Sequence, residues 1–118
     1  MSNKTLGDQG ENCAADHLRR QGYRILARNY RTKSGEIDII ADDHGTLVFV
    51  EVKTRSNTRY GTPAEAVHYR KRQKIIQTAH WYLHAQHREN ALCRFDVLEV
   101  YTAGNSWNIH HIKNAFET

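Results

Sequence analysis

The feature that most constrains the fold is a pair of apolar segments separated by a short turn. The segments are "GEIDIIA" (residues 35–41) and "TLVFVEVKTR" (residues 46–55), with the letters "DDHG" between them. Runs rich in β-branched residues on both sides of a turn signal predict a β-hairpin. Side chains alternate across a strand, so Glu51 and Lys53 share one face at the end of an apolar strand.

The length of the turn predicts the register of this hairpin. If His44 and Gly45 form the centre of a tight turn, the next pair outward is Asp43 with Thr46. Counting on along both strands places Asp38 opposite Glu51 and Glu36 opposite Lys53. One face of the hairpin is then wholly apolar and belongs to the core; it consists of Ile37, Ile39, Ala41, Val48, Val50 and Val52. The other face carries Asp38, Glu51 and Lys53.

Two carboxylates that face each other destabilise a sheet unless a positive group lies between them. Lys53 alone could supply this charge, and for an E-x-K sequence by itself that structural explanation is favoured. The aspartate on the partner strand reverses the preference. Asp38, Glu51 and the main-chain carbonyl of Val52 offer hard oxygen ligands for a divalent cation. Lys53 is then placed to hold an attacking water and to stabilise charge on a phosphate.

The remaining elements predict an α/β fold with a mixed sheet flanked by helices. We expect a helix over about residues 7–21, a strand over 23–30, the hairpin, a helix ending near Gln86 and a strand over 93–101. Thr62, before Pro63, marks a helix start, and the second helix is expected to divide near His68. Glu11 lies about 20° from Leu18 around the first helix, beside its buried arc. A position near the end of the hairpin would add Glu11 to the acids there, although a helix-start glutamate favoured by the macrodipole explains it equally well.

Composition predicts a single cytoplasmic domain. The chain has 118 residues, 39% of them hydrophobic and 25% charged, which suits one domain over residues 1–118. The core is expected over about residues 6–101, followed by a turn and an edge strand over 102–118. Two cysteines, Cys13 and Cys93, are too few for a disulfide scaffold and are expected to stay reduced. No apolar run has the length of a membrane span, so we expect no membrane association.

The net charge of +4 and the pI near 9.2 favour a polyanionic partner. The basic residues near the proposed site are the best candidates for phosphate contacts: Arg31, Lys33, Arg55, Arg70, Lys71, Arg72 and Lys74. His80, His84 and His87 share a helical face, but the H-E-x-x-H pattern of a zinc site is absent, so zinc is not favoured. Arg94 and Asp96 are expected to form an ion pair.

Four stretches occur in an order that resembles the YraN-like family of small bacterial proteins. They are "GDQGENCAADHL", "NYRTKSGEIDIIA", "LVFVEVKTR" and "RFDVLEV". The resemblance covers about residues 6–100 and implies a restriction-endonuclease-like αβββαβ fold, related to Holliday junction resolvases. Ile37 stands where relatives often have a proline before the aspartate.

The resemblance also implies roles for individual residues. Asp38 and Glu51 would bind Mg²⁺ or Mn²⁺, Lys53 would be the catalytic lysine, and Glu11 would be the acidic residue of the first helix. Some relatives place a glutamine of the following helix near the metal, for which Gln73 and Gln77 are equal candidates. Junction-cutting relatives act as dimers, which implies a homodimer as a candidate assembly.

The leading hypothesis from the sequence is a metal-dependent endonuclease that hydrolyses DNA, branched or single-stranded, without a covalent enzyme intermediate. The first alternative is a DNA-binding module that keeps the fold and the acids but does not turn over substrate. The second is a scaffold protein whose acidic face only balances charge. Titration with Mg²⁺ or Mn²⁺ and cleavage assays on branched, single-stranded and duplex DNA separate the three.

Overall fold

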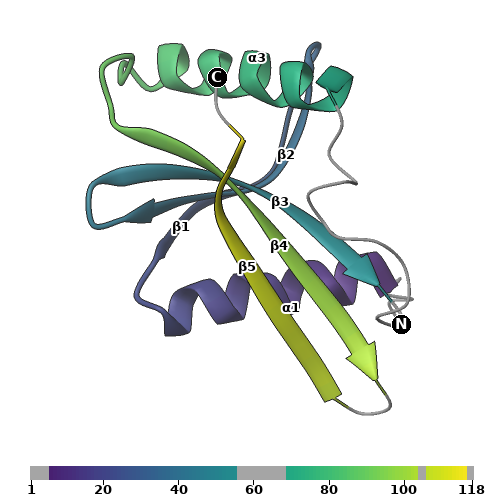
Figure 1. Cartoon of the computed structure of the whole chain (residues 1–118). Coiled ribbons are helices and arrows are strands. Elements are labelled where there is room, and N and C mark those ends of the chain that lie inside the picture. Colours follow the sequence, from purple (N-terminus) through teal and green to yellow (C-terminus); the bar gives the residue numbers. More distant parts are fainter. Residues whose placement is uncertain (1–5, 56–68, 104–105, 117–118) are drawn as a thin grey trace, which may run out of the picture.

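The computed structural model describes residues 6–55, 69–103 and 106–116 of the chain (Figure 1). Helix α1 (Leu6–Arg20) is followed by three strands: β1 (Arg24–Thr32), β2 (Gly35–Asp43) and β3 (Thr46–Arg55). Helix α3 (Tyr69–Ala85) then leads to β4 (Cys93–Ala103) and β5 (Ser106–Phe116). This order confirms the predicted αβββαβ core and the predicted edge strand. The helix start predicted at Thr62 and the division near His68 lie outside the described residues.

The five strands form one mixed sheet in the order β1-β2-β3-β4-β5. Neighbouring strands are antiparallel except β3 and β4, which are parallel. Parallel neighbours need a long crossover connection, and α3 lies within the segment that joins them. Figure 1 shows α1 and α3 on opposite sides of the sheet. The architecture is the α/β class that was predicted, with a restriction-endonuclease-like arrangement.

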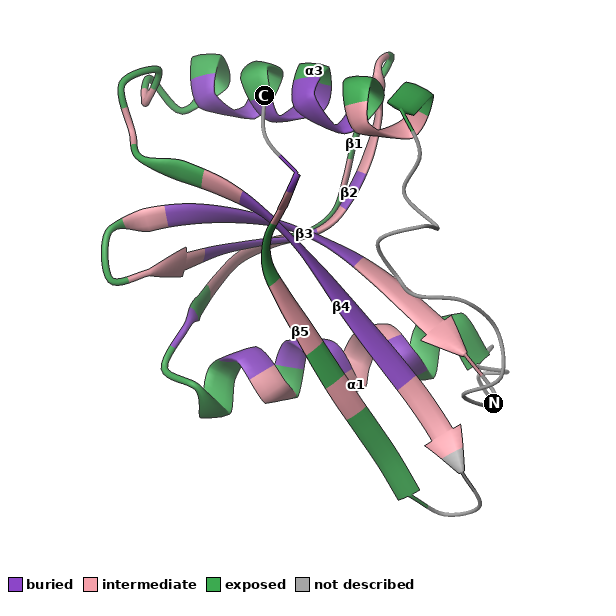
Figure 2. Ribbon diagram, viewed as in Figure 1, coloured by how far each residue is buried: buried purple, intermediate pink, exposed green. Residues whose placement is uncertain are grey.

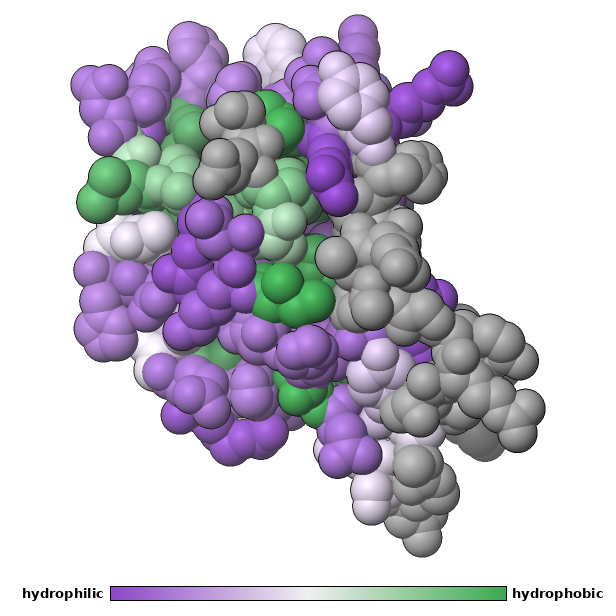
Figure 3. Space-filling view, viewed as in Figure 1, coloured by the Kyte–Doolittle hydropathy of each residue, from purple (hydrophilic) through white to green (hydrophobic). Residues whose placement is uncertain are grey.

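Both faces of the central sheet are buried. On the α3 side the core contains Ile37, Ile40, Leu47, Phe49, Ile75, Ile76, Ala79, Tyr82, Leu83, Phe95, Val97 and Phe116. On the α1 side it contains Ala14, Ala15, Leu18, Tyr23, Ile39, Ala41, Val48, Val50, Leu98 and Val100. Figure 2 shows the buried residues concentrated in the central strands, and Figure 3 shows hydrophobic side chains between α3 and the strands. The prediction of a single core face on the hairpin was therefore incomplete, because α3 covers the second face.

The β2–β3 hairpin has the predicted register. Asp43 pairs with Thr46, and the antiparallel pairing continues to Ile39 with Val50. His44 and Gly45 both have positive φ angles, 51° and 99°, as a tight two-residue turn requires. The pairing stops one residue before Asp38 and Glu51, because β2 bends there.

The bend occurs in both strands of the β1–β2 hairpin. Arg28 pairs with Ile39 and Tyr30 with Ile37, while Asn29, between the two pairs, has a φ of 52°. Ile39 belongs to the core on the α1 side and Ile37 to the core on the α3 side. The prediction that these two residues share a face is therefore wrong. A left-handed residue interrupts the alternation of side chains and turns the hairpin tip toward α3 (Figure 1).

A buried polar network joins β4 and β5 to the α1 side of the sheet. Asp96 is fully buried and accepts hydrogen bonds from His111 Nε2 at 2.7 Å and the Asn114 main-chain N–H at 2.9 Å. Arg94 Nε lies 3.1 Å from Asp96 Oδ1, which confirms the predicted ion pair, and Arg94 Nη1 lies 2.9 Å from Asp43 Oδ2. Burial alone would raise the pKa of Asp96, but these partners lower it overall.

No helix within the described ranges combines the length and the apolar character needed to cross a membrane.

Candidate metal and phosphate site

The site begins where the β2–β3 pairing ends. The Asp38 carboxylate accepts a hydrogen bond from the main-chain N–H of Val52, with 2.8 Å between Oδ2 and N. If the β2–β3 pairing continued, Val52 would lie opposite Ile37 and its N–H would bond to a main-chain carbonyl of β2. Here the carboxylate of Asp38 accepts that hydrogen bond instead. This bond fixes the aspartate of one strand against the middle residue of the Glu-Val-Lys sequence of the next.

The main-chain carbonyl of Val52 faces the same edge of β3 as its N–H. In an extended strand the N–H and C=O of one residue point to the same side. Because the N–H of Val52 is directed at Asp38, its carbonyl oxygen is directed toward β2, past the last β2–β3 pair. The contribution of Val52 to a cation site stays a prediction.

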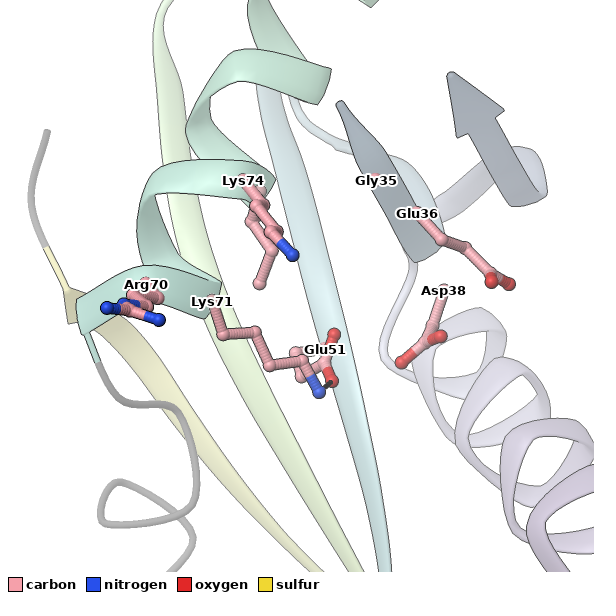
Figure 4. A pocket seen from close by; sticks show the side chains of 8 residues that line it. Gly35, Glu36, Asp38, Glu51, Arg70, Lys71 and Lys74 are labelled. Carbon is pink, nitrogen blue, oxygen red and sulfur yellow. Dashed lines mark ion pairs between the residues drawn. The ribbon is translucent and has the colours of Figure 1, made fainter. Parts of the chain in front are cut away.

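Glu51 is buried, with 7% of its side chain exposed, and faces α3. Its Oε1 lies 3.3 Å from the Nζ of Lys53 and also forms an ion pair with the Nζ of Lys71. Figure 4 shows Lys71 reaching from α3 to Glu51, while the carboxylates of Glu51 and Asp38 face one another from opposite sides of a pocket. Lys53 thus comes from the same strand as Glu51, and Lys71 from the helix that covers it.

The pocket has a volume of about 460 Å³ and lies between β2, β3 and α3. It is lined by Gly35, Glu36, Asp38, Glu51, Arg70, Lys71, Lys74 and Ile75. Carboxylates therefore lie on its strand side and ammonium or guanidinium groups on its helix side. A polar pocket with both signs of charge suits a ligand that brings an anion and a cation together.

The electrostatics of the acid pair depend on burial. Desolvation, followed by the charge of Glu51, raises the pKa of Asp38 to about 7, although the hydrogen bond from Val52 opposes the rise. The charges of Glu11 and Glu36 raise it further. Burial and the neighbouring Lys71 lower the pKa of Lys53, against the influence of Glu51. Without a further cation, Asp38 at neutral pH is therefore close to its midpoint of protonation.

Glu11 reaches the neighbourhood of the site from the α1 side. Gly10 packs against Thr54 of β3, and a Cβ added at Gly10 would lie 2.7 Å from Thr54 Cγ2. This close approach brings Glu11 within electrostatic range of Asp38. Its direct partner, however, is Arg28 of β1, whose Nη2 lies 3.3 Å from Glu11 Oε1 and 2.8 Å from Asn12 Oδ1. The sequence pattern did not predict Arg28 as this partner.

The donor set fits a hard, partly hydrated cation. Mg²⁺ binds through one or two carboxylates, retains several waters and also takes phosphate oxygens. Asp38, Glu51 and the carbonyl of Val52 supply such a set. Among the described residues, no three or more His, Cys, Asp or Glu side chains are grouped so that they could hold a metal ion by themselves. His80, His84 and His87 with Cys93 form no such group.

Comparison with known proteins places the chain in a family. The profile of the "Uncharacterised protein family UPF0102" matches residues 10–100. The chain belongs to the UPF0102 family. It is 48% identical over 116 residues to a UPF0102 protein of Clostridioides difficile, covering 98% of this chain and all of the relative. It is 47% identical over 111 residues to one of Persephonella marina (94% and 92% covered) and 54% identical over 97 residues to one of Symbiobacterium thermophilum (82% and 82%).

Membership of UPF0102 confirms the YraN-like resemblance, and the match includes the residues of the site. Asp38, Glu51, Lys53 and Glu11 all lie within residues 10–100. The names of these relatives assign no activity.

The basic residues predicted to contact phosphate occupy several places. Arg70, Lys71 and Lys74 line the pocket. Lys33 borders a separate hollow at the tip of the β1–β2 hairpin, and Arg31 forms an ion pair with Glu36 at 3.2 Å. The remaining two point elsewhere: Arg72 lies over the ring of Phe116, and Arg55 is half-buried at the end of β3.

Neither candidate glutamine lines the pocket in this UPF0102 chain. Gln73 is exposed, and Gln77 borders the next hollow along α3. Lys71 instead approaches Glu51 from this helix. A signal for it exists in the sequence, because Lys71 lies four residues before the buried Ile75 and so interrupts the buried stripe of α3 with a charge.

Proposed function

We propose that this protein is a metal-dependent endonuclease that hydrolyses phosphodiester bonds of DNA. The observation that supports the proposal most strongly is the Asp38–Val52 hydrogen bond, which aligns Asp38 with Glu51 and Lys53. Two carboxylates that face each other beside a half-buried lysine are costly to fold. A site that retains such a pair is a functional candidate with a physical reason.

Asp38, Glu51 and the carbonyl of Val52 would hold Mg²⁺ or Mn²⁺. When bound, such an ion lowers the pKa of water and stabilises the charge that develops on a phosphate. The protein's own contribution is to orient the oxygen ligands and to limit their contact with solvent. Glu51 is 7% exposed, so its charge acts in a medium of low dielectric constant.

Lys53 would accept the proton of the attacking water. Hydrolysis forms a bond between the water oxygen and phosphorus and breaks the bond between phosphorus and the leaving oxygen. The attacking water gives up a proton, and the leaving oxygen takes up a proton from solvent. Burial lowers the pKa of Lys53, which increases the neutral fraction that can accept this proton. Lys71 and Lys74 line the pocket and would contact the phosphate as cations.

DNA is the favoured substrate because the net charge of the chain is positive and the helix side of the pocket is cationic. The net charge is +4, and Arg70, Lys71 and Lys74 line the pocket on its α3 side. These contacts would bind backbone phosphate irrespective of sequence. We place the activity in the cytoplasm because Cys13 and Cys93 are both free thiols.

One observation favours the alternative of a DNA-binding module without turnover. Lys53 and Lys71 both pair with Glu51, so the charge of this carboxylate is balanced without a metal ion. A module of this kind would bind DNA through the same rim but would show no specific affinity for Mn²⁺.

Calorimetric titration with Mn²⁺ separates the two functions. The wild type, Asp38→Asn and Glu51→Gln should be compared with Asp16→Asn, an exposed acid on α1 with 61% of its side chain accessible. We expect one binding event in the wild type and in Asp16→Asn, and an affinity at least about tenfold weaker in the two site variants. Equal affinity in all four proteins would refute a metal site at Asp38 and Glu51.

A further inference from the structure

We propose that a groove between α3 and the tip of the β1–β2 hairpin binds a single strand of DNA, with Trp81 stacking on one of its unpaired bases. This inference rests on the proposed function, because it takes DNA as the polymer that reaches the Asp38 pocket.

Three neighbouring hollows form this groove. The first is the Asp38 pocket, which includes Gly35 and Lys74. The second has a volume of about 490 Å³ and is lined by Ser34, Gln77, His80, Trp81 and His84. The third has a volume of about 380 Å³ and is lined by Tyr30, Thr32, Lys33, Trp81 and Ala85. Ser34 of the second hollow is adjacent to Gly35 of the first, and Gln77 lies one helical turn after Lys74. The second and third hollows have Trp81 in common, so the three hollows follow one another along α3.

The hairpin tip forms the second wall of the groove because it packs directly against the helix. A Cβ added at Gly35 would lie 3.4 Å from Lys74 Cβ and from Thr78 Oγ1. The bend at Asn29 directs the tip toward α3 (Figure 1). The tip therefore lies beside the same side chains that form the helical wall.

One face of α3 presents the residues that a nucleic acid strand would contact. Arg70, Lys74, Gln77 and Trp81 are separated by four, three and four residues, so they lie within about 60° around the helix axis. Lys71 is turned by about 100° from Arg70 and reaches Glu51 instead. The face thus carries cations next to the carboxylates and an aromatic ring farther along.

Trp81 has the exposure of a stacking platform. It is 57% exposed, although a tryptophan side chain is usually more buried. Its neighbours in the two hollows are mainly polar, among them His80, His84 and Lys33. An exposed aromatic ring among polar and cationic side chains is the composition that binds single-stranded nucleic acid, because every base offers a face for stacking.

Two acids near the groove have basic partners. Glu36 pairs with Arg31 at 3.2 Å, and Glu89 lies 3.5 Å from Nδ1 of His84, which carries a charge only when it is protonated. The charge of Glu36 is therefore compensated by Arg31.

The spacing predicts a short unpaired segment. Ten residues separate Lys71 from Trp81, which corresponds to about 15 Å along a helix axis. At about 3.4 Å per stacked nucleotide this distance spans about four nucleotides. A base inside a duplex is already stacked on both faces, so Trp81 can contact it only if the strand is unpaired.

Intrinsic fluorescence tests this inference because the chain has two tryptophans. Trp107→Phe leaves Trp81 as the reporter, and Trp81→Phe leaves Trp107, which is 37% exposed beside α1 residues such as Asn12. Each protein should be titrated with a 12-nucleotide oligothymidylate in EDTA, which prevents metal-dependent cleavage. We expect strong quenching in Trp107→Phe and little in Trp81→Phe. Equal quenching in both proteins, or quenching in neither, would overturn the proposal.

Affinity supplies an independent readout. Trp81→Ala should weaken binding of the oligothymidylate about tenfold, as expected for the loss of one stacked base, and should leave binding of a 12-base-pair duplex within about twofold. Wild-type affinity for the single strand, or an equal loss for both DNAs, contradicts stacking by Trp81. Circular dichroism melts of each variant confirm that the fold is retained.

Cleavage in Mn²⁺ separates this inference from the proposed function. If the oligothymidylate quenches the fluorescence of Trp81 but the wild type cuts no DNA, the proposed groove is supported and the proposed hydrolytic chemistry is wrong. If the wild type cuts DNA and Asp38→Asn does not, the proposed chemistry is supported. If the oligothymidylate then leaves the fluorescence of Trp81 unchanged, the proposed groove is wrong.

Discussion

The carboxylate of Asp38 on β2 accepts a hydrogen bond from the main-chain N–H of Val52 on β3, with 2.8 Å between the two atoms. Val52 is the residue between Glu51 and Lys53, so this single bond sets the position of Asp38 relative to both. It forms where the β2–β3 pairing ends and takes the place of the next ladder bond. The site is therefore part of the sheet itself, and its side chains are held by main-chain geometry.

Asp38→Asn should stabilise the metal-free protein at high pH. Burial and Glu51 raise the pKa of Asp38 from 3.8 to about 7, so the folded state binds more protons than the unfolded state between these values. The wild type therefore loses stability as the pH rises through this interval, whereas asparagine has no proton to lose. We expect the variant to be about 1–3 kcal/mol more stable at pH 8, with the difference disappearing near pH 4. Urea unfolding at pH 4, 6 and 8 measures it.

The same comparison for Asp16→Asn provides the control, because Asp16 is exposed on α1. A lower stability of Asp38→Asn than of the wild type at pH 8 would contradict the proposed repulsion between buried acids.

The hairpin could be predicted from sequence because its determinants are local. The turn "DDHG" fixes the register, and strict alternation then places Glu51 and Lys53 on one face. The structure confirms the pairing of Asp43 with Thr46 that the turn predicts. Local patterns cannot show how far a ladder continues, and this one ends at Ile39 and Val50.

The bend at Asn29 could not be predicted for a related reason. Asparagine tolerates a left-handed conformation, but it occurs in strands without adopting one, so the residue type alone does not signal the kink. The kink moves Ile37 to the α3 side and directs the hairpin tip to the helix. The spacing of Lys71 from Ile75 places it in line with the buried stripe of α3, but its approach to Glu51 depends on how α3 packs on the sheet.

Lys71→Gln should increase the affinity for Mn²⁺. The ammonium group of Lys71 pairs with the carboxylate oxygen that a cation would use, and removing it removes both a competitor and a like charge. An interaction of about 1 kcal/mol corresponds to about fivefold in affinity. Calorimetry on Lys71→Gln and on Lys113→Gln, an exposed lysine of β5, measures the effect. Unchanged or weaker affinity in Lys71→Gln would show that Lys71 does not compete for this site.

Gly10→Ala should destabilise the protein even though alanine is the better helix former. An added Cβ would lie 2.7 and 2.9 Å from Thr54 Cγ2 and Cβ, so α1 would have to move away from β3. We expect a loss of about 1–3 kcal/mol in the free energy of unfolding. Gln9→Ala, at an exposed position of the same helix, should change it little.

Thr54→Ala removes Cγ2 of Thr54, which an added Cβ at Gly10 would meet at 2.7 Å. The double variant should therefore regain part of the stability that Gly10→Ala loses. Additive losses would mean that Thr54 is not the contact that limits the approach of α1.

Asn29→Val should destabilise the fold and distort the site, whereas Asn29→Gly should be tolerated. Asn29 has a φ of 52°, and a β-branched residue in this conformation costs about 1–2 kcal/mol. Thermal unfolding of both variants measures the cost, and Mn²⁺ affinity reports on the position of Asp38. Equal stability of the two variants would show that the bend does not depend on the left-handed residue.

The most direct test of the central claim is the cleavage rate of a single-stranded DNA oligonucleotide in Mn²⁺, measured for the wild type, Asp38→Asn and Lys53→Ala purified in parallel. We predict cleavage by the wild type and a rate at least about a hundredfold lower in both variants, as expected when a group that acts on the reacting atoms is lost. Absence of cleavage by the wild type, or equal rates in all three proteins, would contradict a hydrolytic site built from Asp38, Glu51 and Lys53.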